Sequence, residues 1–593
     1  MRLMRVEAMR VDRNGWTEGA VLLGVALCFV LPFMQPYHAL PLPSFEAEWL
    51  AGAVLSATLL VTALAAKQND KATLQWPLPA FLLGLLALGV VHRVSDRLSY
   101  SYALSNLVIA VVAVLGAYTL GRWLLHRGRL DAVMTAASAA LITGGLASVG
   151  LQCLQVLGIQ GLPEWLVTAH AQEYTSQPYA NVGQPNHLAT YLTLGVVAAV
   201  YLDTRAWPRL AIRLVLLILA AGVALTGSRM GLLMVLLVAL APALRPRLTA
   251  FRRGELGWSV SGMLAAGYAA GLLAGRLLAP SVVGSQSTME RVAEAAYGDR
   301  LTMWADALRI TLSSPLTGVG VGEYAHAQYW LARPTSELIG TPYAHNTVLQ
   351  FAAEFGVVAG IAFAVLCLWW FLGDWSRRRA APALVCVVAM VALLGIHAML
   401  EWSLWVLFVA ILAGLLFALG EPPLRRAFSL DVRLIFAALG VAGLAWSPLM
   451  KADYDSVADA AWNLEFEGSA GFGISKEMIE GLSTNSTATY FKPQSDRLVI
   501  RAAPPIRKPV SGDQVERTWK VLTRLPEERT IAVYIAGLAL SGRVAESLPH
   551  VERMRVFAVT PERYSKAEEI VLKILKDEGA AAEPLRAELA RWR

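Results

Sequence analysis

The sequence is poor in charge for its length. Lys, Arg, Asp and Glu make up 16% of its 593 residues, whereas 56% are hydrophobic and the mean hydropathy is +0.50. Soluble folds rarely carry so little polar surface. A transmembrane helix needs about 20 apolar residues, a length that many stretches reach. The composition therefore predicts an integral membrane protein and argues against a soluble fold.

The usual signatures of metal, nucleotide and disulfide chemistry are also missing. The sequence contains no Walker A loop, no HExxH helix, no CxxC pair and no acidic cluster with metal-binding spacing outside the apolar stretches. The four cysteines all lie within apolar stretches, which argues against disulfides and a zinc site: Cys28, Cys153, Cys367 and Cys386. We therefore expect no cofactor, no bound metal and no nucleic-acid partner.

Thirteen apolar stretches are candidate transmembrane helices, and they predict an all-α polytopic membrane protein. They lie near residues 18–34, 47–66, 77–91, 101–120, 132–157, 188–204, 209–226, 230–244, 257–275, 347–373, 382–399, 402–420 and 431–448. The first follows four arginines, so a signal peptide is one interpretation. No small-residue cleavage site follows it, which favours a retained anchor with a cytoplasmic N-terminus.

The basic residues test this topology. Alternating sides from a cytoplasmic N-terminus places most basic residues of the short loops on one side: Lys67, Lys71, Arg122, Arg127, Arg129, Arg205, Arg209, Arg245, Arg247, Arg252, Arg253, Arg377, Arg378, Arg379, Arg425 and Arg426. The short loops of the other side carry almost none apart from Arg93 and Arg97. This is the positive-inside pattern, and it marks the basic side as cytoplasmic.

The chain divides into a membrane domain, predicted over 1–449, and a soluble domain, predicted over 450–593. Two non-cytoplasmic loops of the membrane domain, 158–187 and 276–346, are longer than plain connectors. The soluble part shows charged amphipathic helices from about 513, and the small residues of "AGLALSG" indicate packing like that of tetratricopeptide (TPR) helix pairs, without a clean repeat. We expect a loop region over 465–512, with short strands as an alternative.

Two arginines on the non-cytoplasmic side are candidate anion ligands. Arg229 lies at a short turn between two apolar stretches, in "TGSRMGLL", and Arg300 lies in the second long loop beside Asp299. An arginine in such a turn is costly unless it is paired or lines a polar cavity, and guanidinium matches phosphate oxygens in bidentate geometry. The alternative is that the side chains extend to lipid headgroups.

His345 is the candidate general base, because a neutral imidazole near the membrane surface can accept a proton from a hydroxyl. It precedes a polar stripe on an apolar helix, formed by Asn346, Gln350 and Glu354 at intervals of four residues. Such a stripe must face protein or water rather than lipid. Glu354 is therefore a candidate substrate ligand, and hydrogen bonding between helices is the alternative for Gln350 and Glu354.

The motif "YANVGQPNHLATYL" places Gln184, Asn186 and His187 directly before an apolar helix on the non-cytoplasmic side. Asn186 is the predicted N-cap, with His187 in the first turn. A cap alone does not explain the neighbouring polar side chains, so all three are candidate substrate ligands.

Aromatic and polar residues near the second long loop have two interpretations. Tyr324, Tyr329, Trp330 and Tyr343 fit an interfacial belt or a surface that stacks on sugars, and we include Tyr324 among the candidate substrate ligands. The group His397, Glu401 and Trp402 is explained by a tight turn with interfacial anchors.

Several motifs together resemble the O-antigen ligase and polymerase superfamily. They are "TGSRMG", then "RLTMW" with "SPLTGVGVGEY", then "HNTVLQFAAEFGVVAG", and the similarity is best over about 180–375. "GQPNHLATYL" resembles the signature of the protein O-oligosaccharyltransferases of the pilin-glycosylating PglL type. The long soluble tail also suits that branch better than lipopolysaccharide ligases.

The resemblance implies a metal-independent glycosyltransferase of the GT-C type in the bacterial inner membrane, with its active site and soluble domain in the periplasm. A glycan would move en bloc from undecaprenyl diphosphate to a Ser or Thr hydroxyl of a pilin-like protein. Arg229 and Arg300 would bind the donor diphosphate, and His345 would act as the base. Gln184 and His187 would shape the substrate site, and Glu323 or Glu294 could share the role of base.

Two other functions remain open at this point. Within the same chemistry, the chain could be an O-antigen ligase that acts on lipid A-core, or an O-antigen polymerase. Outside it, a polytopic lipid or glycan transporter is the alternative. Transporters more often show internal repeats or helices broken near the midplane, which the sequence does not show.

Overall fold

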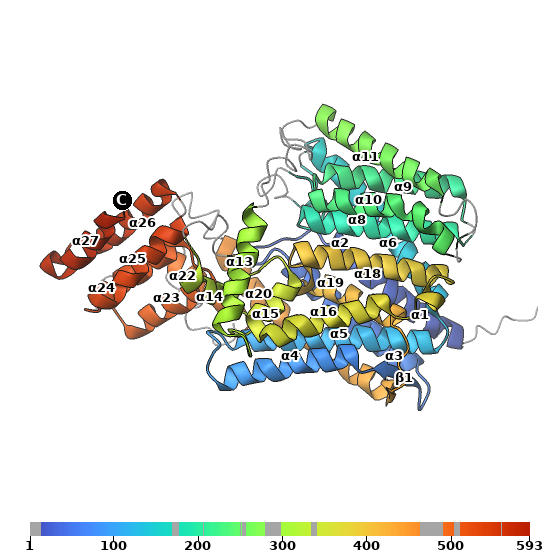
Figure 1. The fold of residues 1–593 in the computed structure, drawn as a ribbon, viewed down its shortest axis with the longest axis horizontal. Coiled ribbons are helices and arrows are strands. Elements are labelled where there is room, and N and C mark those ends of the chain that lie inside the picture. The colour runs from blue at the N-terminus through green and yellow to red at the C-terminus, as the bar shows by residue number, and fades with distance from the viewer. Residues whose placement is uncertain are drawn as a thin grey trace, which may run out of the picture.

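The computed structural model describes residues 13–159, 161–168, 177–205, 207–248, 251, 257–278, 298–333, 341–462, 490–502, 510–558 and 560–592. The described chain is almost entirely helical (Figure 1). Seven helices in it are long and apolar enough to cross a membrane, and four shorter ones are also apolar. The chain is therefore an all-α, multi-pass membrane protein, as the composition predicts.

Each of the thirteen predicted ranges falls on a helix of the described chain. These helices are α1 (Arg13–Cys28) with α2 (Leu31–Met34), α3 (Phe45–Ala65), α4 (Pro77–Val94), α5 (Tyr102–His126), α6 (Leu130–Val156), α8 (Pro185–Asp203), α9 (Arg209–Leu225), α10 (Arg229–Leu240), α11 (Trp258–Leu278), α15 (Thr347–Phe355) with α16 (Val357–Leu372), α18 (Pro382–Leu400), α19 (Leu407–Gly420) and α20 (Val432–Trp462). Three further helices lie outside these ranges: α13 (Gly298–Ser313) and α14 (Tyr324–Leu331) in the second long loop, and α17 (Trp375–Arg378) in a connection predicted to be cytoplasmic.

The predicted span 347–373 is broken at Gly356. Its φ is +93°, and a Cβ atom there would lie 2.3 Å from the carbonyl oxygen of Leu316. Glycine alone tolerates both constraints. The break allows the chain before α14 to pack against the end of α15, where the Val319 and Gly320 amides donate to the carbonyls of Ala353 and Glu354.

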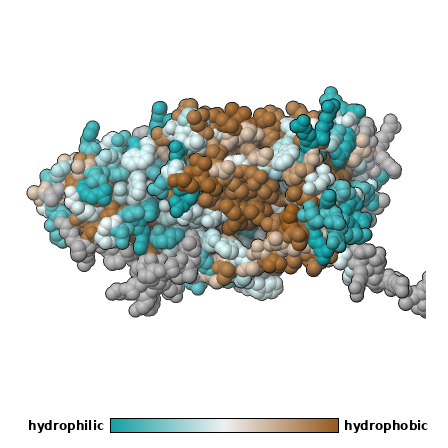
Figure 2. All heavy atoms as spheres, turned by 90° about the horizontal axis from the view of Figure 1, so that it is seen from below, coloured by the Kyte–Doolittle hydropathy of each residue, from teal (hydrophilic) through white to brown (hydrophobic). Residues whose placement is uncertain are grey.

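Helix α8 lies at the centre of one half of the membrane domain and is buried along nearly its whole length. It packs against α6, α9, α10 and α18, while α3 packs against α20 and α5 against α19. Hydrophobic side chains gather across the middle of the molecular surface, with hydrophilic ones at both ends (Figure 2). The apolar middle is the surface expected to face lipid.

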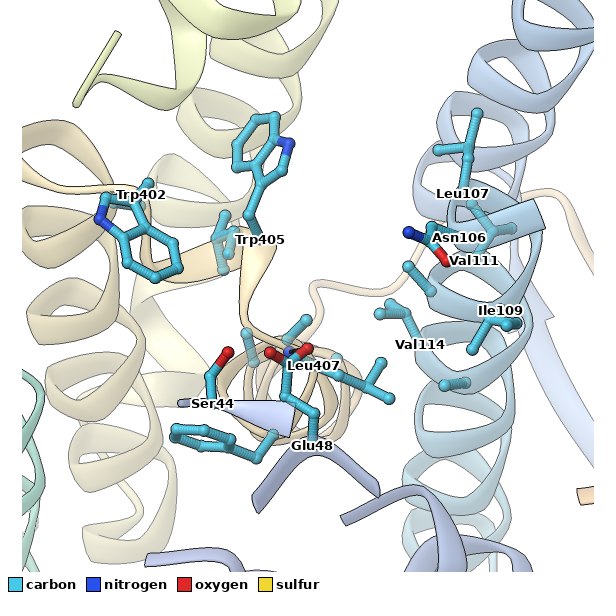
Figure 3. A pocket seen from close by; sticks show the side chains of 18 of the residues that line it. Ser44, Glu48, Asn106, Leu107, Ile109, Val111, Val114, Trp402, Trp405 and Leu407 are labelled. Atoms are coloured by element: carbon cyan, nitrogen blue, oxygen red, sulfur yellow. Dashed lines mark hydrogen bonds between the residues drawn. The ribbon is translucent and has the colours of Figure 1, made fainter. Parts of the chain in front are cut away.

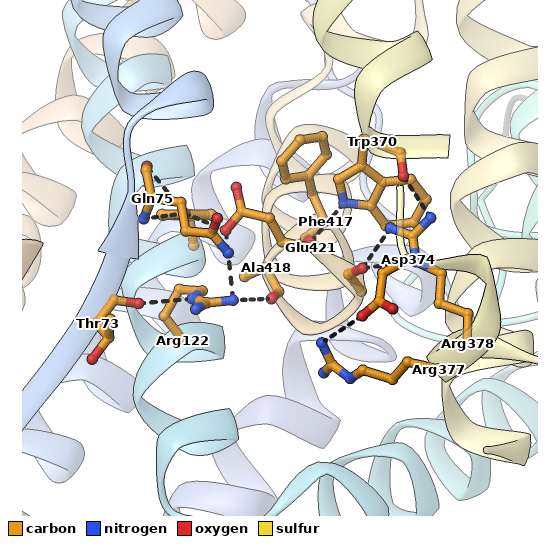
Figure 4. Close-up of polar contacts among 12 residues, drawn as sticks. Thr73, Gln75, Arg122, Trp370, Asp374, Arg377, Arg378, Phe417, Ala418 and Glu421 are labelled. Carbon is orange, nitrogen blue, oxygen red and sulfur yellow. Dashed lines mark hydrogen bonds and ion pairs between the residues drawn. The ribbon is translucent and has the colours of Figure 1, made fainter. Parts of the chain in front are cut away.

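A polar layer closes the end of the membrane domain that the basic residues predict as cytoplasmic (Figure 4). Strands β1 (Lys71–Gln75) and β2 (Ala427–Asp431) form an antiparallel two-stranded sheet there, with Lys71 opposite Asp431. Arg122 lies 3.5 Å from the Glu421 carboxylate, and Arg127 lies 3.0 Å from Asp70. Segments that the charge pattern assigns to one side are therefore neighbours in the fold.

The C-terminal helices form a second hydrophobic core at the opposite end of the molecule (Figure 1). They are α23 (Gly512–Arg524), α24 (Glu528–Leu540), α25 (Val544–Ala558), α26 (Pro561–Ile574) and α27 (Glu583–Arg591). Helix α22 (Lys492–Ala502) precedes them and packs instead with α20 in a smaller cluster. The expectation of a loop over 465–512 is wrong for 492–502, because that stretch is helical; 463–489 lies outside the described residues. Since α20 runs continuously past residue 450, the domain boundary there stays a prediction.

Candidate active site

A buried carboxylate, Glu401, joins three of the predicted site residues. It follows the last residue of α18 and is 6% exposed. One carboxylate oxygen accepts hydrogen bonds from the Asn186 side-chain amide at 2.9 Å and from Arg300 at 3.0 Å. The other lies 3.5 Å from Nε2 of His345. Residues from three distant stretches of the sequence therefore meet at one point.

The polar motif before α8 is built differently from the prediction. Gln184, not Asn186, is the N-cap of α8, because its side-chain oxygen accepts from the backbone N–H of His187 at 2.8 Å. Pro185 occupies the first helical position, where its missing N–H costs nothing. Asn186 does not cap the helix, and its side chain connects two groups instead. Its amide nitrogen donates to Glu401, and its amide oxygen accepts from the Ser228 hydroxyl at 2.6 Å.

Arg229 begins α10, one residue after this bridge. The Ser228 hydroxyl caps α10 by accepting from the Gly231 N–H at 3.0 Å, and the Arg229 residue is exposed. The first turns of α8 and α10 lie side by side, since a Cβ on Gly231 would meet that of Ala189 at 2.8 Å. Two helix N-termini with an arginine beside them favour an anion.

His345 has a strained backbone, with φ of +50°, a conformation uncommon for residues other than glycine. Three contacts hold its loop. The Ala344 N–H donates to the Gln350 side-chain oxygen at 2.6 Å, and Nδ1 of His345 lies 3.3 Å from the Tyr343 carbonyl. Asn346 caps α15 by accepting from Leu349 N–H at 3.1 Å. The imidazole edge facing Glu401 is therefore defined by the loop.

The remaining carboxylates of this region are held by hydrogen bonds. Glu354 is 2% exposed, and one of its oxygens accepts from the Gly322 N–H at 3.0 Å and from Gln350 at 3.1 Å. Glu323 accepts the Ser99 amide and hydroxyl, each at 2.7 Å. These bonds hold the Glu323 carboxylate in place, and its predicted share in the role of base stays a prediction. Glu294, the other predicted candidate, lies outside the described residues.

The prediction of a sugar-stacking surface does not hold for Tyr324. Its side chain is fully buried, and its hydroxyl donates to the Met303 carbonyl at 3.3 Å. Because no face of the ring is accessible, Tyr324 belongs to the core between α13, α14 and α15. Tyr343 instead stacks on Trp402, with ring centroids 5.0 Å apart and planes within 9°.

A cavity of about 1810 Å³ lies beside the Glu401 cluster. Its walls are mostly apolar side chains of α3, α5, α16, α18 and α19, and Figure 3 shows Trp402 and Trp405 across from Asn106 and Leu107. Gln184, His187 and Glu354 also line it. The His187 ring lies 5.0 Å from that of His397 and 5.7 Å from that of Trp402. Tyr343 and Trp402 also line the cavity, and they lie two residues before His345 and one residue after Glu401 in the sequence.

Comparison with known protein families decides what this arrangement resembles. Residues 214–364 match the O-antigen ligase family, residues 178–202 match the protein glycosylation ligase family, and residues 385–571 match the C-terminal part of virulence factor membrane-bound polymerases. The predicted resemblance is confirmed. The chain is also similar to a general O-oligosaccharyltransferase of Acinetobacter baylyi, with 25% identity over 73% of this chain and 76% of the relative.

The matched segments contain the whole cluster. The protein glycosylation ligase match spans the motif before α8, the O-antigen ligase match spans Arg229, Arg300 and His345, and the polymerase match spans Glu401. Together these similarities support the predicted class of membrane glycosyltransferase for this chain.

Glu401 was not among the predicted site residues, because a tight turn with interfacial anchors explained it. A signal existed, since an acidic residue at the end of an apolar helix is costly and needs a partner. The partner could not be read from the sequence, because Arg300 and Asn186 are 101 and 215 residues away.

Proposed function

We propose that this protein transfers a glycan from a polyprenyl diphosphate, most simply undecaprenyl diphosphate, to a Ser or Thr hydroxyl of an acceptor protein such as a pilin. The observation that carries the proposal is the meeting of Asn186, Arg300 and His345 at the Glu401 carboxylate. It brings a candidate base within reach of a candidate diphosphate ligand. The similarity to a general O-oligosaccharyltransferase supports a protein acceptor.

His345 would act as the general base. With Nε2 facing Glu401, Nδ1 would remove the proton of the acceptor hydroxyl, which would take the place of the Tyr343 carbonyl beside Nδ1, while the hydroxyl oxygen attacks the anomeric carbon. Glu401, 3.5 Å from Nε2, would orient the ring and stabilise the imidazolium that forms. The bond between the anomeric carbon and the diphosphate oxygen breaks, and polyprenyl diphosphate leaves with its negative charge.

Arg300 and Arg229 would stabilise that charge. The Arg300 side chain is 36% exposed although it pairs with Glu401, so a diphosphate can reach the guanidinium. Arg229 and the N-termini of α8 and α10 add positive potential on the Ser228 side of the cluster. Groups fixed in place before the reaction stabilise developing charge without reorganising. Metal independence is part of this proposal.

The large cavity would hold the polyprenyl chain. Its apolar lining suits an isoprenoid, and Gln184 and His187 lie where the lining meets the Glu401 cluster. The site would then open at the periplasmic face of the bacterial inner membrane, the side opposite the basic loops. The same side carries the C-terminal helices, which would help to present the acceptor protein.

Glycan transfer in a heterologous periplasm tests the proposal. The host supplies undecaprenyl-linked glycan and a pilin acceptor, and the mass of the acceptor is the readout for wild type, Arg229→Ala, His345→Ala and His187→Ala. We expect a glycan-sized mass increase with wild type and its loss in the Arg229 and His345 variants at equal membrane expression. An unmodified pilin with wild-type protein would contradict the proposal.

An O-antigen ligase or polymerase is the second candidate, because residues 214–364 match the O-antigen ligase family and residues 385–571 the polymerase family. The same experiment in a ligase-deficient host separates the two functions. Capped lipopolysaccharide with unmodified pilin would establish the ligase, and modified pilin without capping would establish protein glycosylation.

A further inference from the structure

We propose that Arg524, in the C-terminal helices, is a positioning residue that holds the loop of His345 in its active conformation. The inference rests on the proposed function, and it assigns to the C-terminal helices a part in the chemical step in addition to acceptor recognition. It stands on a continuous series of hydrogen bonds that runs from α23 to the residue before His345.

The series begins at the last residue of α23. Nη1 of Arg524 donates to the Gly322 carbonyl at 2.5 Å, and the guanidinium lies over the ring of Tyr102 at 5.4 Å. Arg524 also lines the large cavity. The contact with Gly322 is close, because φ of this glycine is +75° and a Cβ atom would lie 2.8 Å from Nη1. Through this hydrogen bond, the C-terminal helices contact the segment between α13 and α14.

Gly322 is also hydrogen-bonded to a residue of α15. Its N–H donates to Glu354 at 3.0 Å, and the same carboxylate oxygen accepts from the Gln350 side chain at 3.1 Å. Gln350 in turn fixes two residues of the loop: its oxygen accepts from the Ala344 N–H at 2.6 Å, and its nitrogen donates to the Pro342 carbonyl at 3.2 Å. Arg524 is therefore connected to the loop of His345 by consecutive hydrogen bonds through Gly322, Glu354 and Gln350.

The loop needs such support because His345 has φ of +50°. For a residue other than glycine this conformation is unfavourable, and it persists only where the surroundings impose it. Without the contact at Gly322, the loop can relax and move the imidazole away from Glu401. A displacement of about 1 Å at a reacting group can cost about 100-fold in rate.

Steady-state kinetics of the purified full-length protein in nanodiscs test this role, with undecaprenyl-diphosphate-linked oligosaccharide and a pilin acceptor. Arg524→Met keeps the length and apolar packing of the side chain but removes its donors. We expect kcat to fall about 10- to 100-fold, by more than any change in KM for the donor, since Arg524 also lines the cavity. Arg524→Lys, which keeps a donor and the charge, should restore most of kcat. The matched control is Lys520→Ala on the same helix, where the side chain is exposed and pairs with Glu516.

A double-mutant cycle with Gln350→Ala tests the series itself. If Arg524 acts through Gln350, the double variant should be no slower than the slower single variant, whereas multiplied effects would overturn the inference. Should Arg524→Met fail to fold, Gln350→Ala decides, because it interrupts the same series of hydrogen bonds and leaves Arg524 and Gly322 in place. An active wild type with an unaltered Arg524→Met refutes this inference alone, whereas an inactive wild type refutes the proposed function.

Discussion

At the scale of single residues, Glu401 should matter as much as the residues that it contacts. Glu401→Gln keeps the shape of the side chain but removes the charge that faces Arg300 and His345. We expect glycan transfer to fall by about 100-fold or more, because the imidazolium loses its stabilising partner. The measurement is kcat in nanodiscs, with Glu164→Gln, an exposed residue of the loop 158–187, as control. If Glu401→Gln retained more than half of the wild-type kcat, Glu401 would have no role in catalysis.

Chelation tests the source of positive charge at the donor. Among the described residues, no three His, Cys, Asp or Glu side chains gather as a metal site requires, whereas two arginines lie at or beside the cluster. We expect transfer to keep its rate after EDTA treatment and dialysis, since guanidinium groups need no ion to bind phosphate oxygens. Loss of activity that Mg²⁺ or Mn²⁺ restores would show that the arginines do not suffice.

The sequence identified most side chains of the cluster but not their partners. Arg229, Arg300 and His345 were predicted because a charged or titratable side chain near apolar helices is costly unless it has a partner or a function. The sequence could not show that Gln184 rather than Asn186 caps α8, since both side chains can accept from a backbone N–H two or three residues further along the chain. Tyr324 was predicted wrongly as a sugar-stacking residue, because its burial depends on how α13 and α15 pack around α14, which periodicity within one helix does not reveal.

At the scale of helices, Arg378 ties two C-termini together. Its guanidinium donates to the Gly420 carbonyl at 2.6 Å and to the Trp370 carbonyl at 2.5 Å, at the ends of α19 and α16 (Figure 4). It also lies 4.3 Å from the ring of Trp370. A cation at a helix C-terminus complements the helix dipole, and buried carbonyls need donors.

Removal of this guanidinium should therefore destabilise the end of the membrane domain that carries the basic loops. For Arg378→Ala we expect a loss of about 3 kcal/mol, from carbonyls left without donors, and a fall of several degrees in the unfolding midpoint. The measurement is thermal unfolding in detergent. Arg377→Ala is the matched control, because Arg377 is exposed and its ion pair with Asp374 should contribute about 1 kcal/mol or less. Equal midpoints for both variants would refute this role.

Hydropathy predicted the membrane helices well, because burial in lipid selects long apolar stretches regardless of partners. It could not predict the break between α15 and α16. That break depends on Gly356 meeting the Leu316 carbonyl, a contact between two elements that the sequence separates by a loop. The helix at 492–502 was missed for a related reason: its apolar residues are few, and Phe491 and Leu498 pack against Tyr454 of α20.

At the scale of the whole molecule, the C-terminal helices pack against the second long loop of the membrane domain. Tyr329 and Ala332 belong to the C-terminal hydrophobic core, and Arg553 donates to the Ala332 carbonyl at 3.0 Å. Tyr329 and Nδ1 of His550 are hydrogen-bonded at 2.6 Å, and their rings stack at 5.9 Å. A loop that leads to His345 is thereby held by a separate core, an arrangement that periodicity within either segment could not predict.

This packing should depend on pH through His550. Burial lowers the pKa of His550 to about 4, whereas an exposed histidine titrates near 6.5. Between these values the unfolded or undocked state binds the proton and the packed state does not, so stability falls as pH decreases from about 6.5 to 4 and is constant above that window. Protonation also removes the acceptor for the Tyr329 hydroxyl. We expect the C-terminal helices to become more protease-sensitive at pH 5 than at pH 7.5, and His550→Gln, which keeps an acceptor but does not titrate, to reduce that difference. An equal difference in wild type and His550→Gln would assign the pH dependence to other groups.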